Sequence, residues 1–151
     1  MSLMSLEDFK GHVGQKIGTS RWFFLNQSRI DLFADVTEDH QFIHVDADLA
    51  SETPFGTTIA HGFLTLSMLS AMSYDSIPRI KGVTMGVNYG FNRIRFVTPV
   101  NSASRVRAHF TLASSDTEKP SEITNVFDVS VEIDGNDRPA LVAEWISRQY
   151  F

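Results

Sequence analysis

The sequence has no cysteine among its 151 residues. This absence excludes a disulfide framework and a cysteine nucleophile, and it agrees with a reducing compartment, so we expect a cytoplasmic protein. The chain also lacks an apolar run long enough to span a bilayer, and its start lacks the basic and apolar regions of a secretory signal. We therefore expect no membrane role.

Positive charge is also scarce, with 13 lysines and arginines against 18 aspartates and glutamates, for a net charge of −5. Binding to phosphate backbones relies on an excess of lysine and arginine, so no nucleic-acid partner is expected. No Pro/Gly-rich linker or internal repeat divides the chain, which predicts one domain over residues 4–151. The second methionine, Met4, indicates that residues 1–3 derive from an expression vector.

The first half of the sequence predicts short helices and one strand. Capping residues, apolar spacing and aromatic density indicate these elements. They are a helix over Leu6–Val13 stopped by Gly14, a strand over Arg21–Leu25, a helix capped by Asn26 with Ile30, Leu32, Phe33 and Val36 largely on one face, a brief helix capped by Asp46 that carries Leu49 and Ala50, and a turn at Pro54–Gly56.

The second half predicts one buried helix followed by four strands. The segment Ile59–Met72 is apolar on nearly every side, which is typical of a buried helix. Alternation such as Val129, Val131 and Ile133 against polar neighbours indicates strands over 83–91, 105–114, 123–133 and 141–150, with a hairpin turn at 134–137. The pattern predicts an α+β domain in which an antiparallel sheet wraps around a central helix.

An aspartate and a histidine five residues apart, Asp39 and His44, are the first candidate catalytic residues. Adding water to a conjugated double bond requires a base for the water and an acid for carbon, and this pair can supply both. We expect Phe33, Phe42 and Ile43 to desolvate the carboxylate partly and make it a better base. The alternative is that Asp39 caps a turn and His44 is a packing residue.

The second candidate is Gly62, at the start of the predicted buried helix. The first backbone N–H groups of a helix have no intrahelical partner, so the Gly62 N–H can bind an oxyanion such as a thioester enolate. The alternative is a glycine chosen for close helix–sheet packing. The two interpretations are compatible.

Together these motifs allow a family resemblance to be stated. Asp39, His44 and Asp46, followed by Ala60-His61-Gly62 at the start of the helix, resemble the signature of R-specific enoyl-CoA hydratases and the wider MaoC-like dehydratases. The likeness is greatest to the nodulation protein N-like members. It extends through Pro54–Gly56, Thr58–Ser67, Asn88–Gly90 and Arg93–Val100.

The resemblance implies a hot-dog fold and a homodimer in which the two sheets join edge to edge. It implies an acyl-CoA substrate, no cofactor beyond the CoA that the substrate carries, and reversible hydration of a trans-2-enoyl-CoA to an (R)-3-hydroxyacyl-CoA. Asp39 and His44 would hold the attacking water, and the Gly62 N–H would bind the thioester carbonyl. Substrate-binding roles are expected for Ser67 and Phe63 on the helix. The candidates for contact with the CoA phosphates are Arg79, Lys81, Arg93 and Arg95, and the alternative is that they are solvated charges at a strand edge.

Other functions and sites stay open at this point. Glu38, Gln41 and Phe42 depart from the usual hydratase motif, so the identity of the acyl group is undetermined. A hot-dog thioesterase and a catalytically silent acyl-CoA binding module are the rival functions. The sequence predicts no metal site, because His12, His40, His61 and His109 do not form a ligand cluster, and His61 is expected to support the turn at Gly62.

Overall fold

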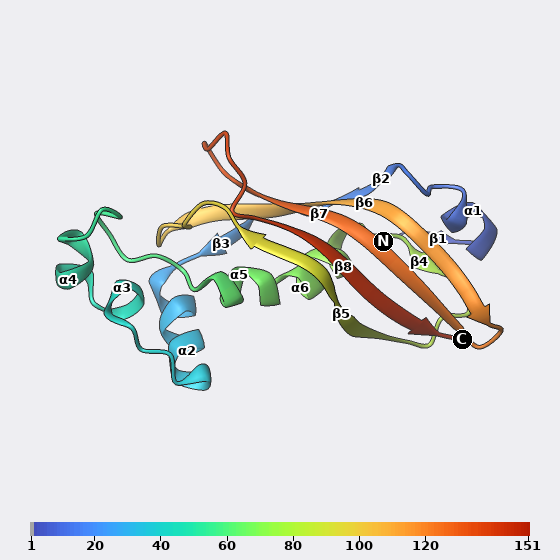
Figure 1. Cartoon of the computed structure of the whole chain (residues 1–151), viewed down its shortest axis with the longest axis horizontal. Coiled ribbons are helices and arrows are strands. Elements are labelled where there is room, and N and C mark those ends of the chain that lie inside the picture. Colours follow the sequence, from blue (N-terminus) through green and yellow to red (C-terminus); the bar gives the residue numbers. More distant parts are fainter. Residues whose placement is uncertain (1) are drawn as a thin grey trace.

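The computed structural model describes residues 2–151, in which one antiparallel sheet curves over a central helix (Figure 1). The sheet order is β2-β6-β7-β8-β5, and β3 also pairs with β6. The expected α+β architecture is confirmed. The strands are β2 (Lys16–Thr19), β3 (Phe23–Leu25), β5 (Met85–Phe96), β6 (Ser104–Lys119), β7 (Glu122–Ile133) and β8 (Leu141–Tyr150).

The sequence predicted which segments form the long strands better than it predicted where those strands begin and end. Strand β8 has the predicted bounds, whereas β5 and β6 each run five residues beyond the predicted end and β2 was not predicted. The turn after β7 is centred on Gly135, whose φ of 74° is in the left-handed region that favours glycine. Strand β5 is an edge strand that pairs with β8 alone among the described residues.

The central helix consists of two parts, α5 (Gly62–Ser67) and α6 (Leu69–Ser76). It begins at Gly62, as expected for the candidate oxyanion donor, although the apolar run starts at Ile59. Ile59 instead forms a bridge with Asn101. The expectation of burial on nearly every side is wrong for this chain: Phe63 and Tyr74 are 66% and 67% exposed. The opposite face is buried in the core with Leu64, Leu69 and Met72.

Four short helices lie at the two ends of the sheet (Figure 1). Helices α2 (Gln27–Thr37), α3 (Phe42–Val45) and α4 (Ala47–Ser51) are at one end, and α1 (Leu6–Lys10) is at the other with the parallel pair β1 (Leu3–Met4) and β4 (Arg79–Ile80). Helix α1 ends earlier than predicted. No helix within residues 2–151 has the length and apolar character needed to cross a membrane.

Side-chain caps fix the starts of α2 and α4. The Asn26 side chain accepts from the Arg29 N–H, and the Asp46 side chain accepts from the Leu49 N–H. The predicted apolar face of α2 is partly wrong. Ile30 is buried, whereas Leu32 and Val36 are exposed, because at 100° per residue they lie about 200° to 240° around the helix from Ile30. In α4, Ala50 is buried and Leu49 is exposed.

Candidate active site

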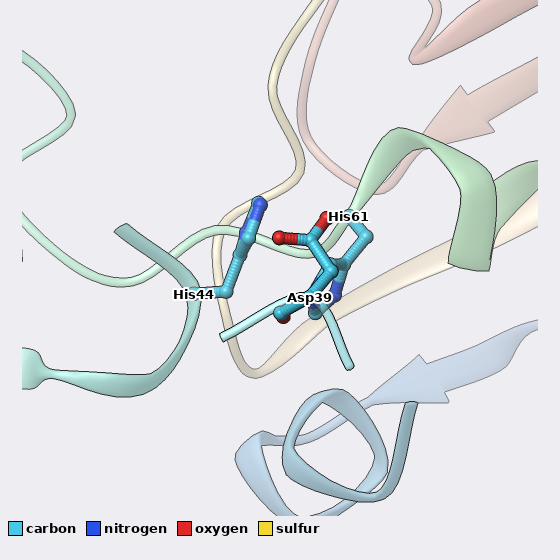
Figure 2. Close-up of side chains that lie close together, drawn as sticks. All are labelled: Asp39, His44 and His61. Carbon is cyan, nitrogen blue, oxygen red and sulfur yellow. The ribbon is translucent and has the colours of Figure 1, made fainter. Parts of the chain in front are cut away.

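The chain reverses direction immediately before Asp39. Helix α2 ends at Thr37, and Glu38 follows in a left-handed conformation with φ of 61°. This turn places Asp39 beside His44 and His61, with one ligand-type atom of each residue within 4.8 Å of the others. Asp39 is exposed in the single chain, so the expected desolvation of its carboxylate is not seen there. Figure 2 shows the three side chains gathered beside the start of the central helix.

His44 is buried on the short helix α3, which replaces the loop expected there. Its Nδ1 lies 2.7 Å from the Ile59 carbonyl oxygen. A carbonyl only accepts, so Nδ1 carries the proton and Nε2 of the neutral ring is an acceptor. Burial lowers the pKa of His44 below its ordinary value of 6.5, the Ile59 hydrogen bond opposes this, and nearby His61 lowers the pKa further.

Gln27 holds the segment that carries His44 against the segment that carries Ile59. Its Nε2 donates to the His44 carbonyl oxygen at 2.7 Å, and its Oε1 accepts from Thr58 Oγ1 at 2.6 Å. The Ile59 N–H also donates to the Ile43 carbonyl oxygen at 3.0 Å. These bonds restrict the position of the His44 ring, which a catalytic ring requires.

His61 links the parts of the site more closely than the sequence indicated. Its ring stacks on His44, with centroids 3.8 Å apart and planes inclined at 26°, and it also packs on Phe33. Its Nε2 is 3.0 Å from the Asp39 carbonyl oxygen, so Nε2 carries the proton. His61 is the N-cap residue of α5, directly before Gly62, but its side chain makes no capping hydrogen bond. Its further contacts to Asp39 and His44 were missed, because they join segments far apart in the sequence.

Gly62 starts α5 under the ring of Phe96. A Cβ built on Gly62 would lie 2.9 Å from two carbon atoms of that ring, so close packing does favour glycine here. No backbone or side-chain group within residues 2–151 accepts a hydrogen bond from the Gly62 N–H. The packing and donor interpretations of Gly62 are therefore compatible in the structure too.

These residues line one pocket of about 370 Å³. The lining includes Asp39 and His44, the segment Ile59–Phe63, Thr65, the segment Phe96–Val100, and Ala140 and Leu141. Three buried polar atoms in the lining have no hydrogen-bond partner: His61 Nδ1, Thr65 Oγ1 and Thr98 Oγ1. Buried polar groups are normally paired, so these three atoms are exceptions among the described residues.

The structure brings some of the expected substrate-binding residues to this pocket and not others. Phe63 lines it. Ser67 does not, because it lies on the exposed helix face with its hydroxyl donating to the Phe63 carbonyl oxygen, and Thr65 instead supplies the hydroxyl in the lining. Arg93 and Arg95 pair with Glu144 and Val142, which alternate with the buried residues of β8, so they lie on the outer sheet face. Their contact with CoA stays a prediction.

The cluster of Asp39, His44 and His61 has the residue types of a metal site, which the sequence analysis did not expect. Its geometry does not suit one. A bound metal must lie about 2.0 Å from a nitrogen of each imidazole and near the plane of that ring. The two rings are stacked, with centroids 3.8 Å apart and planes inclined at 26°, so one metal ion cannot satisfy this for both rings. The free nitrogens are better arranged for hydrogen bonds.

The lowered pKa of His44 predicts how activity and stability respond to acid. If catalysis requires the neutral form of His44, kcat/KM should stay constant as the pH falls to about 6.5 and should decrease only below that pH, because the buried ring resists protonation. Stability should also fall below pH 6.5, because unfolded His44 binds a proton there that the folded ring does not. A pH profile of kcat/KM with denaturant melts checks both. An acidic limb above pH 6.5 would contradict this assignment.

Known proteins resemble the chain along almost its whole length. Residues 8–132 match the family described as the MaoC like domain. Nodulation protein N of Rhizobium leguminosarum bv. viciae is 50% identical over 148 residues, covering 97% of this chain and 92% of that protein. The 3-hydroxyacyl-thioester dehydratase Z of Mycobacterium tuberculosis is 42% identical, covering 95% of each.

Solved structures agree on the fold. The (R)-hydratase of A. caviae involved in PHA biosynthesis superimposes with a TM-score of 0.73 at 24% identity, over 89% of this chain and 94% of that one. The MaoC-like dehydratase of Rhodospirillum rubrum gives a TM-score of 0.78 at 17% identity, over 97% of both. The hot-dog fold is thereby confirmed. The chain belongs to the MaoC-like dehydratase family.

Proposed function

We propose that the protein catalyses reversible hydration of a trans-2-enoyl-CoA to an (R)-3-hydroxyacyl-CoA. The observation that carries this proposal is that Asp39, His44 and the free N–H of Gly62 line one pocket. Relatives named as a 3-hydroxyacyl-thioester dehydratase and an (R)-specific enoyl-CoA hydratase support the reaction class.

In the proposed mechanism, Asp39 and His44 are the two acceptors for one water molecule, and the closeness of their ligand atoms, within 4.8 Å, supports this. The Asp39 carboxylate accepts one of its hydrogens and the free Nε2 of neutral His44 accepts the other, which leaves an oxygen lone pair free to attack C3 of the enoyl group. Asp39 takes a proton as the new C–O bond forms, and the electrons move to the thioester oxygen. The Gly62 N–H stabilises that enolate until the pair returns the proton to C2.

A thioesterase is the rival that uses the same scaffold, and one assay separates the two functions. Hydration consumes the enoyl absorbance of crotonyl-CoA without releasing thiol, whereas hydrolysis releases CoA that a thiol-reactive dye detects. We expect loss of enoyl absorbance and no dye signal across several acyl chain lengths. A dye signal would support the thioesterase, and binding without either change would support a silent binding module.

We also propose a homodimer joined along β5. This strand has 12 residues, a free edge among the described residues, and exposed apolar side chains at Met85, Val87 and Tyr89. A long apolar edge of this kind is normally covered.

Sedimentation tests the dimer. We expect the wild-type protein to be a dimer in dilute solution, and Tyr89→Lys to weaken it, because a two-fold axis brings each new charge near its own copy. Leu32→Lys is the matched control, since Leu32 is exposed on α2 at the end of the molecule and should not affect association. A wild-type monomer that is fully active would contradict the proposal.

A further inference from the structure

His61 contacts the proposed catalytic residues but has no assigned part in the proposed reaction. Its side chain is 2% exposed and packs on the rings of both His44 and Phe33. Burying an imidazole costs free energy that a hydrocarbon side chain of similar size would not cost, and the His61 Nδ1 has no hydrogen-bond partner within residues 2–151 to offset it. A buried polar ring at this place therefore points to a role beyond packing.

The backbone at Asp39 is held by this ring. Residues 39–41 lie between α2 and α3 and belong to no helix or strand. Within residues 2–151, the Asp39 backbone makes no hydrogen bond to another backbone group. The His61 Nε2, which donates to the Asp39 carbonyl oxygen at 3.0 Å, is the hydrogen-bond donor that holds it. Since the Asp39 side chain is exposed, the position of its carboxylate depends on this bond.

The same ring limits the movement of His44. The two rings are stacked with centroids 3.8 Å apart, so the His44 ring cannot turn toward His61 without a clash. The His44 Nδ1–H is bound to the Ile59 carbonyl oxygen. These two contacts together fix the direction of the His44 Nε2, which accepts from water in the proposed reaction. Figure 2 shows His61 beside both Asp39 and His44.

His61 also directly precedes Gly62, the first residue of α5, so chain connectivity ties its ring to the start of that helix. Its side chain does not cap the helix. It uses its N–H on the Asp39 segment instead, 22 positions earlier in the chain. One residue thus links Asp39, His44 and Gly62, which come from three separate segments.

We propose that His61 is a positioning residue, which holds the Asp39 carboxylate and the His44 Nε2 at the separation that one bound water molecule requires. The inference rests on the proposed hydration. His61 transfers no proton in this account, because its Nε2 is bound to a backbone carbonyl and its Nδ1 is covered. It acts only through Asp39 and His44.

Three substitutions separate the two contacts of the ring. His61→Phe keeps a ring against His44 and removes the donor, His61→Gln keeps an amide N–H for the Asp39 carbonyl oxygen and removes the ring, and His61→Leu removes both. We expect kcat with crotonyl-CoA to fall about 10²-fold in His61→Leu and about tenfold in each of the other two, because a misplaced base and water cost this much. KM should change by less than about threefold, since CoA binding is untouched. Met72→Ala, a buried change outside the pocket lining, is the control that lowers stability and should keep kcat.

A measurement without substrate separates this inference from the hydration itself. NMR relaxation of the backbone amides should show that residues 39–41 gain nanosecond motion in His61→Phe and His61→Leu, and stay ordered in His61→Gln and Met72→Ala. If the wild-type protein hydrates no enoyl-CoA, the proposed function fails and the relaxation data still decide whether His61 positions Asp39. His61→Gln and His61→Phe keep the test decisive if His61→Leu does not fold. The proposal is overturned if residues 39–41 stay equally ordered in His61→Phe, or if Met72→Ala loses as much kcat as the His61 variants.

Discussion

Asparagine at either Asp39 or His44 is expected to lower the turnover of crotonyl-CoA by about 10² to 10⁴-fold, the usual contribution of general acid–base catalysis. Each side chain is proposed to accept one hydrogen of the same water, so losing either misplaces the nucleophile. The effects should not add. The double variant should be little slower than the slower single variant, because residues that act as a unit lose nearly everything at the first change.

Substrate binding separates this result from unfolding. Neither side chain is proposed to hold the CoA moiety, so all three variants should still bind crotonyl-CoA. Asp35→Asn is a matched control, because this nearby exposed carboxylate contacts His40 rather than the pocket and should leave turnover unchanged. Near wild-type turnover in a folded Asp39→Asn protein would contradict the proposal that Asp39 is the base in a hydration reaction.

The second large effect is expected at Gly62. Proline there removes the N–H donor at the first position of a helix, where proline is tolerated, so turnover should fall by about 10² to 10³-fold. The structure adds a complication, because the new ring carbons would meet Phe96. The Phe96 ring must move for the variant to fold.

A control for this steric effect is available. Gly62→Ala adds the same Cβ but keeps the N–H, and a Phe96→Ala background removes the ring that either substitution would meet. In that background we expect Gly62→Ala to retain most of the turnover and Gly62→Pro to lose it. Equal turnover in the two folded variants would show that the oxyanion donor lies elsewhere.

The sequence predicted what short-range patterns encode. Capping at Asn26 and Asp46, the end of β3 at Leu25 and the bounds of β8 follow from neighbouring residues. The start of α5 at Gly62 also agrees with the sequence, but the role of Ile59 does not follow from it, because its bridge with Asn101 is a long-range contact.

Some contacts in the candidate active site depend on tertiary packing, which the spacing of residues along the sequence does not reveal. The stack of His61 on His44 joins residues 17 positions apart and needs the chain reversal after α2. Helix geometry alone could have shown that the hydroxyl in the pocket lining comes from Thr65 and not from Ser67. Thr65 is three residues after Gly62 and shares its face, whereas Ser67, five residues after it, points elsewhere.

The measurement that tests the central claim most directly is dehydration of the two enantiomers of 3-hydroxybutyryl-CoA by the wild-type protein. The proposed site predicts that crotonyl-CoA forms from the (R) enantiomer, that the (S) enantiomer is not consumed, and that Asp39→Asn abolishes the reaction. If both enantiomers bind and neither loses water, Asp39 and His44 are not an acid–base pair for this chemistry and the account is contradicted.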